Sequence, residues 1–325
     1  MTTTISQRFS VVMLGAFLAS SALAQNFPNR PLRFIIPYPP GGTTDLVGRA
    51  FAAQLGKVLG QQVIVDNRSG AAGSLGTDMV AKSARDGYTL GMSSVAPFAV
   101  NPACNPKVPY DPVTDFQAVT EIASSPHAIL VNATFPAKNY AEFLALIKAS
   151  PGKYSFATAG TCGTGHMVGA GFMYASRTHM LHVPYRGAGP AAIDVLANQV
   201  PILIDGLPST LGHIRNGSMR AIVIASPKRS ESVSDVPTFA EVGLEEVSDP
   251  SWYGLVVPAG TPDTTVKLLH EASVKALKDP ALLERFRLVG AVPGGTTPAQ
   301  HGAQIKKSRD RMRLLVKEQN ITPDS

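Results

Sequence analysis

Two segments rich in glycine and hydroxyl residues carry the groups best suited to hold a small anion. The first, residues 37–45, follows the apolar run 32–36 and precedes an amphipathic segment. Its glycines let the backbone approach a ligand closely, and the turn places N–H groups at the start of a helix. Asp45 would repel an anion, so we expect it to be structural and to cap that helix. The candidate binding residues are Tyr38, Pro40, Gly41, Gly42 and Thr43.

The second segment, residues 159–166, lies between an expected strand and an expected helix. Glycines and hydroxyls at a helix N-terminus supply hydrogen-bond donors and a favourable dipole for a carboxylate. The glycine spacing differs from Gly-x-Gly-x-x-Gly, and no acidic residue follows about twenty positions later, which excludes a dinucleotide site. The candidates here are Gly160, Thr161, Gly163, Thr164 and His166.

Further candidates follow other strands. Ser93 and Ser94 end the strand expected at 88–92, where open α/β sheets border the ligand crevice, although a plain turn role is equally open. Tyr185 is a candidate for lining a cleft. Asp205 ends the strand expected at 202–204; in a pocket it would favour a ligand carrying a donor such as an amine or amide, and otherwise it would anchor neighbouring N–H groups.

Catalytic and metal chemistry find weaker support. Cys162 and His166 have the i, i+4 spacing of a thiolate–imidazole pair, which makes a Cys-dependent hydrolase an alternative. No third group completes that pair, and a free nucleophilic thiol in an exported protein is prone to oxidation. The histidines show no metal-ligand spacing, so we expect no metal, no cofactor and no enzymatic activity.

Cys104 and Cys162 are the only cysteines. In an oxidising compartment they could form one disulfide. The alternative is two isolated buried thiols, because the sequence does not supply the Cα separation that a bridge requires.

Residues 1–24 have the pattern of a secretory signal peptide. Arg8 is their only charge, residues 9–18 are apolar, and Ala22-Leu23-Ala24 is a small-x-small cleavage site. We therefore expect export to the periplasm after cleavage near Ala24. The formal net charge of the chain is +6, and the densest basic cluster, 306–317, alternates with apolar residues. This favours the solvated face of a terminal helix over nucleic-acid binding.

Short β-rich runs alternate with helical patterns, which predicts an α/β fold with largely parallel sheets. We expect strands at 32–36, 63–65, 88–92, 128–131, 154–157, 202–204, 221–225 and 253–257. We expect helices at 45–59, 74–83, 140–149, 166–176, 188–197, 264–276, 280–288 and 298–318. The Pro-rich passage 101–112 and a second crossing near 224–227 predict two lobes: residues 25–102 with 225–325, and residues 103–224. A ligand cleft would lie between them.

A series of short motifs resembles one known family across the whole mature chain. They include Pro37-x-x-Pro40-Gly41-Gly42-x-x-Asp45, Asp86-Gly87-Tyr88-Thr89-Leu90, Pro109-Tyr110-Asp111-Pro112, Asp205-x-x-Pro208-Ser209 and Ser251-Trp252-Tyr253-Gly254. The sequence is similar to the Bug family, the TctC-like solute-binding components of tripartite tricarboxylate transporters. Where that family usually has Gly, this chain has Cys162, and Gly163 replaces a common hydroxyl residue.

The resemblance implies a two-lobed periplasmic binding-protein fold of the second topological type. It also implies a protein that captures a small organic acid or an acidic amino acid and delivers it to membrane transporter subunits. We expect the protein to be a monomer. A sensory binding protein that signals to a membrane receptor is an alternative. Trp252 and Tyr253 are expected in the core of the first lobe.

Overall fold

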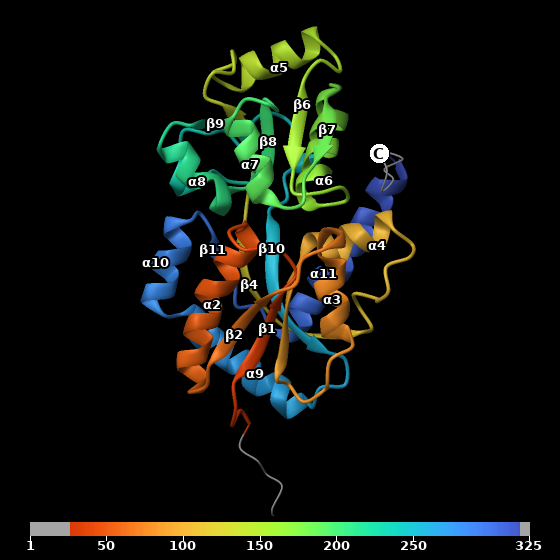
Figure 1. Cartoon of the computed structure of the whole chain (residues 1–325), viewed down its shortest axis with the longest axis vertical. Coiled ribbons are helices and arrows are strands. Elements are labelled where there is room, and N and C mark those ends of the chain that lie inside the picture. Colours follow the sequence, from red (N-terminus) through yellow and green to blue (C-terminus); the bar gives the residue numbers. More distant parts are fainter. Residues whose placement is uncertain (1–26, 319–325) are drawn as a thin grey trace, which may run out of the picture.

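The computed structural model describes residues 27–318, so the predicted signal peptide lies outside the described part of the chain. Two separate sheets, each flanked by helices, form two lobes, as the sequence pattern predicts (Figure 1). None of the helices between residues 27 and 318 combines the length and the apolar character that crossing a membrane requires.

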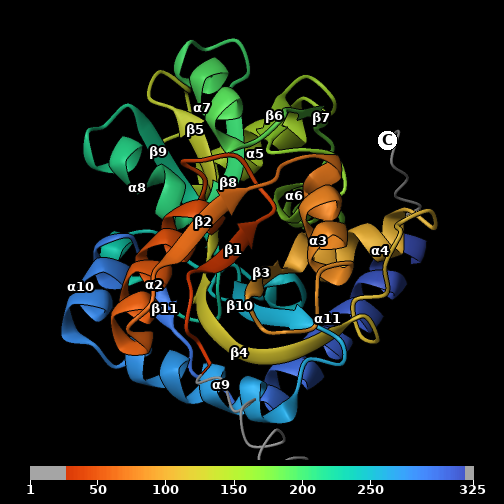
Figure 2. The ribbon, with the colours of Figure 1, turned by 60° about the horizontal axis from the view of Figure 1, so that its bottom comes forward.

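The first lobe contains a six-stranded sheet of order β11-β4-β10-β3-β1-β2. Strands β1 and β2 and strands β1 and β3 pair in parallel, whereas β10 runs antiparallel to both β3 and β4. The strand bounds are β1 Leu32–Ile36, β2 Val63–Asn67, β3 Thr89–Ser94, β4 Phe116–Ser125, β10 Ser251–Pro258 and β11 Val292–Pro293. The helices are α2 Thr43–Leu59, η1 Ala71–Gly73, α3 Ser74–Ala81, η2 Ala96–Val100, α4 Asn101–Cys104, α9 Asp263–Leu277, α10 Pro280–Leu288 and α11 Pro298–Glu318. Helices α9 and α11 pack on β4 (Figure 2).

The second lobe contains a five-stranded sheet of order β7-β6-β8-β5-β9. Its strands are β5 His127–Asn132, β6 Ser155–Thr158, β7 Leu181–Pro184, β8 Ile202–Gly206 and β9 Met219–Ala225. Its helices are α5 Tyr140–Ala149, α6 Thr164–Ser176, α7 Ala188–Leu196, α8 Leu207–Arg215, η3 Glu231–Val233 and η4 Glu245–Val247.

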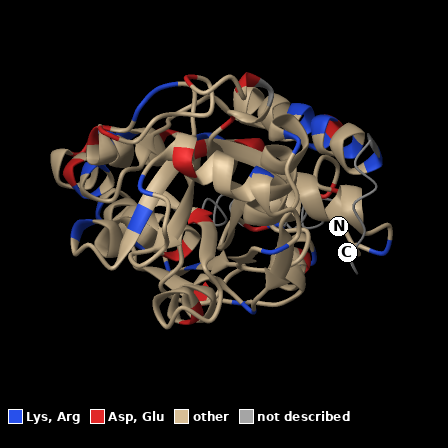
Figure 3. Ribbon diagram, turned by 90° about the horizontal axis from the view of Figure 1, so that it is seen from above, with Lys and Arg blue, Asp and Glu red and all other residues tan. Residues whose placement is uncertain are grey.

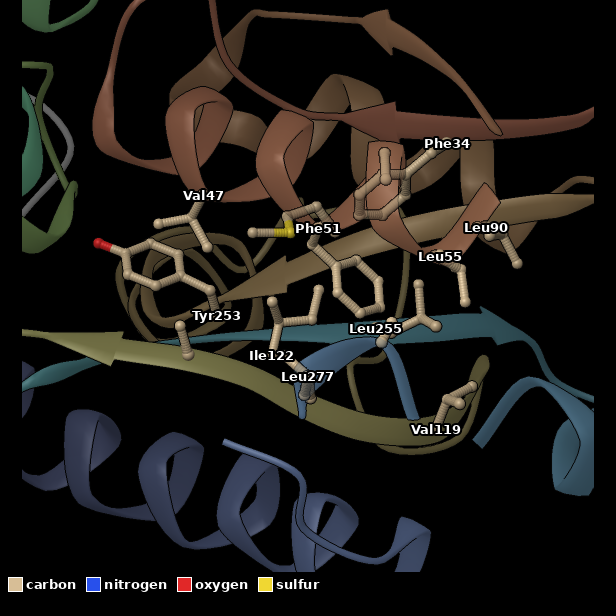
Figure 4. Close-up of a cluster of buried hydrophobic side chains, with 14 of the residues drawn as sticks. Phe34, Val47, Phe51, Leu55, Leu90, Val119, Ile122, Tyr253, Leu255 and Leu277 are labelled. Carbon is tan, nitrogen blue, oxygen red and sulfur yellow. The ribbon is translucent and has the colours of Figure 1, made fainter. Parts of the chain in front are cut away.

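Helix α2 shows how sequence produces the core of the first lobe. Val47, Phe51 and Leu55 recur every four residues, so they share one face of the helix, and all are fully buried. Phe51 meets Phe34 of β1 edge to face at a centroid distance of 6.3 Å (Figure 4). Gly60 ends the helix in the left-handed conformation, with φ of 66°.

The sheets place the lobe boundaries later in the chain than predicted. Strand β4 pairs with β10 in the first lobe, so the chain first crosses between β4 and β5 and returns just before β10. The Pro-rich passage is not the crossing, because its Tyr110 packs on Phe116 within the first lobe. Residues 226–248 stay with the second lobe, where Phe239 and Leu244 are buried in its core. The predicted boundaries at 103 and 225 are therefore corrected.

Most other expected elements match. The prediction of largely parallel sheets is wrong, because β5, β10 and β11 run antiparallel to the strands they pair with, so both sheets are mixed. The sequence pattern did not predict β4, β7, β11, α4, α8 or the short helices η1, η2, η3 and η4. Strand β4 is the longest strand of the described chain, but Gln117, Thr120 and Glu121 interrupt its apolar pattern. Helix α8 begins Leu207-Pro208, which resembles a turn in sequence, yet Pro is favourable at the start of a helix.

Candidate functional site

A cleft between the lobes gathers the ends of strands and the starts of helices from both sheets. It encloses about 110 Å³. A cavity of about 150 Å³ admits benzene, so this cleft suits a ligand of few atoms. Its lining is formed by Tyr38, Pro39, Pro40, Gly42, Thr43, Thr44, Ala72, Ser94, Val95, His127, Ala159, Gly163, Thr164, Gly165, Gly187, Ala188, Gly189, Pro190, Asp205, Gly206, Ser251 and Tyr253.

Among the helices that begin at this cleft are α2 from the first lobe and α6 and α7 from the second. Their N-caps are glycines, Gly42, Gly163 and Gly187, and no side chain caps any of them. By contrast, Asn139 and Asp279 cap α5 and α10, which lie outside the cleft. The first N–H groups of a helix have no partner within it. The three starts therefore present donors and the positive ends of three helix dipoles to the cleft.

The lining contains no Lys or Arg among the described residues. Asp205 is its one acidic residue. Positive potential in the cleft therefore comes from backbone N–H groups and helix dipoles, an arrangement that binds anions without a fixed cation.

A side-chain network holds the loop before α2. Asp45 Oδ2 accepts the Gly41 N–H at 3.0 Å, and Asp45 Oδ1 accepts from Arg49 Nε at 2.8 Å and Asn67 Nδ2 at 2.9 Å. Burial alone would raise the pKa of Asp45, but the bonds from Arg49, Gly41 and Asn67 hold that pKa below its ordinary value. Asp45 is structural, as expected, although it braces the loop at Gly41 rather than capping the helix, whose N-cap is Gly42.

The two lobes touch directly across the cleft. Thr43 Oγ1 of the first lobe donates to Ser209 Oγ of the second at 3.1 Å, and Ser209 Oγ donates to Asp205 Oδ2 at 2.6 Å. Gly206 lies so close to Thr43 that a Cβ at Gly206 would overlap the Thr43 side chain. The structure therefore shows a closed arrangement of the lobes.

Asp205 is 8% exposed, and burial raises the pKa of its carboxyl, although the hydrogen bonds from Ser209 and the Gly206 N–H oppose that shift. Burial also raises the pKa of Tyr253, which faces the same cleft. His127 accepts or donates at Nδ1 to Ser251 Oγ, 2.9 Å away, and burial lowers the pKa of its imidazole to about 4. At neutral pH the imidazole is therefore uncharged.

Eight predicted site residues line this cleft: Tyr38, Pro40, Gly42, Thr43, Ser94, Gly163, Thr164 and Asp205. The Ser94 hydroxyl is buried, and no hydrogen-bond partner for it is found among the described residues. Gly160, Thr161 and Tyr185 instead line an adjoining groove of about 640 Å³, which shares Tyr38, Pro39, Ala72, Ala159 and Gly187 with the cleft. The Tyr185 hydroxyl also donates a hydrogen bond to Asp194 Oδ2 at 2.6 Å, and burial raises the pKa of Tyr185 to about 12.

Three predicted residues lie outside both linings. Gly41, with φ of 88°, shapes the turn and donates to Asp45. Ser93 Oγ bonds to His301 Nε2 at 3.0 Å, on the opposite face of β3 from Ser94. His166 stacks on His182 at 3.9 Å between ring centroids and accepts the Cys162 N–H at Nδ1. His166 is thus occupied in positioning the second lobe's loop rather than facing the cleft.

Sequence reasoning missed His127, Ser251, the start of α7 and the cleft role of Tyr253. Tyr253 belongs to the core, as expected, but it lines the cleft as well. The predicted helix at 188–197 could have revealed the α7 start, because Gly187 precedes it. Nothing in the local pattern marks His127, which enters the cleft only because β5 lies between β8 and β9.

Three of the six basic residues in the cluster 306–317 of the terminal helix form ion pairs. Lys306 and Arg309 contact Asp310, and Arg311 pairs with Asp249. In the view from above, basic and acidic residues are interspersed over the surface (Figure 3). Residues 27–318 contain no group of three or more His, Cys, Asp or Glu side chains arranged to hold a metal ion.

Comparison with known proteins identifies the family. Residues 47–321 match the family model described as the tripartite tricarboxylate transporter family receptor. Protein BugT of Bordetella pertussis is 36% identical over 314 residues, covering 95% of this chain and 96% of BugT. The chain belongs to this receptor family.

Solved structures agree with this receptor-family fold. A periplasmic transporter shares 43% identity at a TM-score of 0.89, covering 91% of this chain and 99% of that one. Rpa4515 of R. palustris, solved with adipate, shares 29% identity at a TM-score of 0.87, with coverage of 91% and 99%. MatC of Rhodopseudomonas palustris, with bound malate, shares 30% identity at a TM-score of 0.84, with coverage of 89% and 100%.

Proposed function

We propose that this receptor-family member is a periplasmic protein that binds a small organic carboxylate in the cleft between its lobes. The observation that carries the proposal is the convergence of three helix N-termini, all with glycine N-caps and none capped by a side chain, on one cleft. Helix N-termini stabilise anions, and glycine leaves the N–H groups accessible.

The division of these donors between the lobes supports a ligand with two anionic ends. Helix α2 faces the cleft from the first lobe, and α6 and α7 face it from the second. A dicarboxylate that engages both lobes binds the closed form more tightly than the open form, and only that difference drives closure. The relatives solved with malate and with adipate bind ligands of this class.

The volume of about 110 Å³ favours a ligand nearer in size to malate, since adipate has a longer carbon chain. A longer acid would extend into the adjoining groove lined by Gly160, Thr161 and Tyr185. The unpartnered Ser94 hydroxyl would gain a hydrogen bond from a ligand oxygen, which relieves the cost of leaving a buried polar group unpaired. Delivery to membrane transporter subunits is the further step that the family implies.

The test is calorimetric titration and thermal shift of the mature protein with malate, succinate and adipate, each paired with its diamide. The diamides keep the size and shape of the acids but remove both charges. We expect the acids alone to bind and to raise the melting temperature. At a ligand concentration of 100 times the dissociation constant, binding adds about 2.7 kcal/mol to the free energy of unfolding. Equal binding of acid and diamide would refute an anion site. A flat panel, repeated after unfolding and refolding to release any retained ligand, would refute carboxylate binding.

A further inference from the structure

The two cysteines of the chain lie on opposite lobes. Cys104 is the last residue of α4 in the first lobe, and Cys162 lies in the loop between β6 and α6 in the second. Both are free thiols and both are buried, with exposed fractions of 6% and 4%. Both side chains belong to the same buried apolar cluster. A bond between them would therefore join the lobes.

The burial of this pair is produced by contact between the lobes. Val100 and Val316 of the first lobe and Met167 and Ala170 of the second surround the thiols in one apolar cluster. Separating the lobes would divide this cluster and expose both cysteines. The closed arrangement brings the thiols together, and an open arrangement would make them accessible to an oxidant.

Hydrogen bonds hold the backbone near each cysteine in place. Asn101 Nδ2, at the start of α4, donates to the carbonyl oxygens of Ala71 and Ala72 at 3.1 and 3.0 Å. On the other side, the Cys162 N–H donates to Nδ1 of His166, whose ring stacks on His182. The relative position of the two thiols is thus set by the fold of each lobe rather than by loose loops.

The backbone at Cys162 adopts φ of 53°, in the left-handed region that favours glycine. A side chain in this conformation is costly, and such a residue often marks a functional role. The neighbouring Cys104 thiol lowers the pKa of the Cys162 thiol against the opposing effect of burial, and His166 lowers it further. The thiolate is the nucleophile in disulfide exchange, so Cys162 is suited to react first.

We propose that Cys104 and Cys162 form a disulfide that bridges the two lobes and holds the protein closed. The oxidant is an external disulfide, either an oxidised dithiol protein or a small disulfide such as oxidised glutathione. The Cys162 thiolate attacks one sulfur of the oxidant, forming a mixed disulfide and releasing one thiolate. The deprotonated Cys104 then attacks the Cys162 sulfur, forming the bridge and releasing the second thiolate. The protein loses two protons and two electrons, and the external disulfide gains them.

The bridge adds a redox control to the proposed carboxylate receptor. A bridged protein would retain any ligand enclosed in the cleft and exclude any ligand outside it, whereas reduction would restore exchange. The periplasmic location that we propose is oxidising, which favours the bridged state.

The experiment uses the mature chain, reduced, without added ligand, and then incubated with oxidised glutathione. Mass spectrometry after thiol labelling counts the free cysteines, and small-angle X-ray scattering reports the radius of gyration. We expect both thiols to be lost without glutathione remaining attached, and the radius of gyration to fall below that of the reduced protein. Adding a reductant should reverse both changes. The matched variants Cys104→Ser and Cys162→Gly should show no redox-dependent change in radius; glycine suits the backbone at residue 162.

Two results would overturn the inference. One is that both thiols still label after oxidation of the folded chain. The other is that the bridge forms but the radius of gyration is the same in the oxidised and reduced states. Neither readout needs a ligand, so failure of carboxylate binding in the titrations would leave this test intact, and failure here would leave the titrations intact.

Discussion

The substitution Gly206→Ala tests whether the lobes must close to bind ligand. Gly206 precedes α8 with φ of −63° and ψ of 141°, a conformation that alanine adopts without strain. Within the second lobe the new methyl group is therefore tolerated. Across the cleft, however, it would overlap Thr43 Oγ1 and lie 3.0 Å from Thr43 Cβ and 3.2 Å from Thr43 Cγ2. Favourable carbon contacts lie at about 3.5–4.0 Å, and rotation of the Thr43 side chain leaves its Cβ at 3.0 Å from the new methyl group.

Overpacking of this kind costs about 1–3 kcal/mol, and here the cost falls on the closed form alone. Since 1.4 kcal/mol corresponds to a factor of ten, we expect the affinity to weaken about 5- to 150-fold. The assay is calorimetric titration with the carboxylate that binds the wild-type protein most tightly, alongside thermal unfolding without ligand.

Gly212→Ala is the matched control. It lies in the same helix, and no atom lies within 4 Å of its added Cβ, so affinity should stay unchanged. Stability should rise slightly, because alanine is the better helix former. If Gly206→Ala folds normally and binds within twofold of the wild type, lobe contact at Thr43 is not part of the binding reaction.

Three further predictions concern charge and donors. Asp205→Asn should raise stability at neutral pH and strengthen dicarboxylate binding several-fold. Burial raises the pKa of Asp205, so the wild-type protein loses stability as pH rises through that pKa, and the gain from Asn should vanish below about pH 4. Weaker binding would instead show that Asp205 accepts a hydrogen bond from the ligand. His301→Gln should reduce the loss of stability at acidic pH. Burial lowers the pKa of His301 from 6.5 to about 4, so the wild-type protein loses up to about 3 kcal/mol of stability as pH falls through that range. An unchanged loss of stability at acidic pH in urea titrations would contradict this. Thr164→Ala should weaken carboxylate binding severalfold by removing a donor at the α6 start, with unchanged melting temperature without ligand; unaltered affinity would remove Thr164 from the site.

The local elements and the anion-binding loop could be predicted from the sequence. Helix α2 and the turn before it follow from apolar residues repeating every four positions, bounded by glycines at both ends. The glycine-rich starts of α2 and α6 would bind an anion through their own backbone N–H groups, so they can be recognised from the sequence without knowledge of distant contacts. Family motifs spread along the chain correctly predicted two lobes.

The tertiary structure alone decided which neighbouring residues face the cleft and where the lobes divide. Ser93 and Ser94 are chemically identical, but side chains alternate across a strand, so Ser93 bonds to His301 and Ser94 faces the cleft. The boundaries moved because β4 pairs with β10, a strand distant in sequence. Cys104 and Cys162 adjoin because two separately folded lobes close on each other. Such contacts depend on how distant segments pack, which local periodicity does not encode.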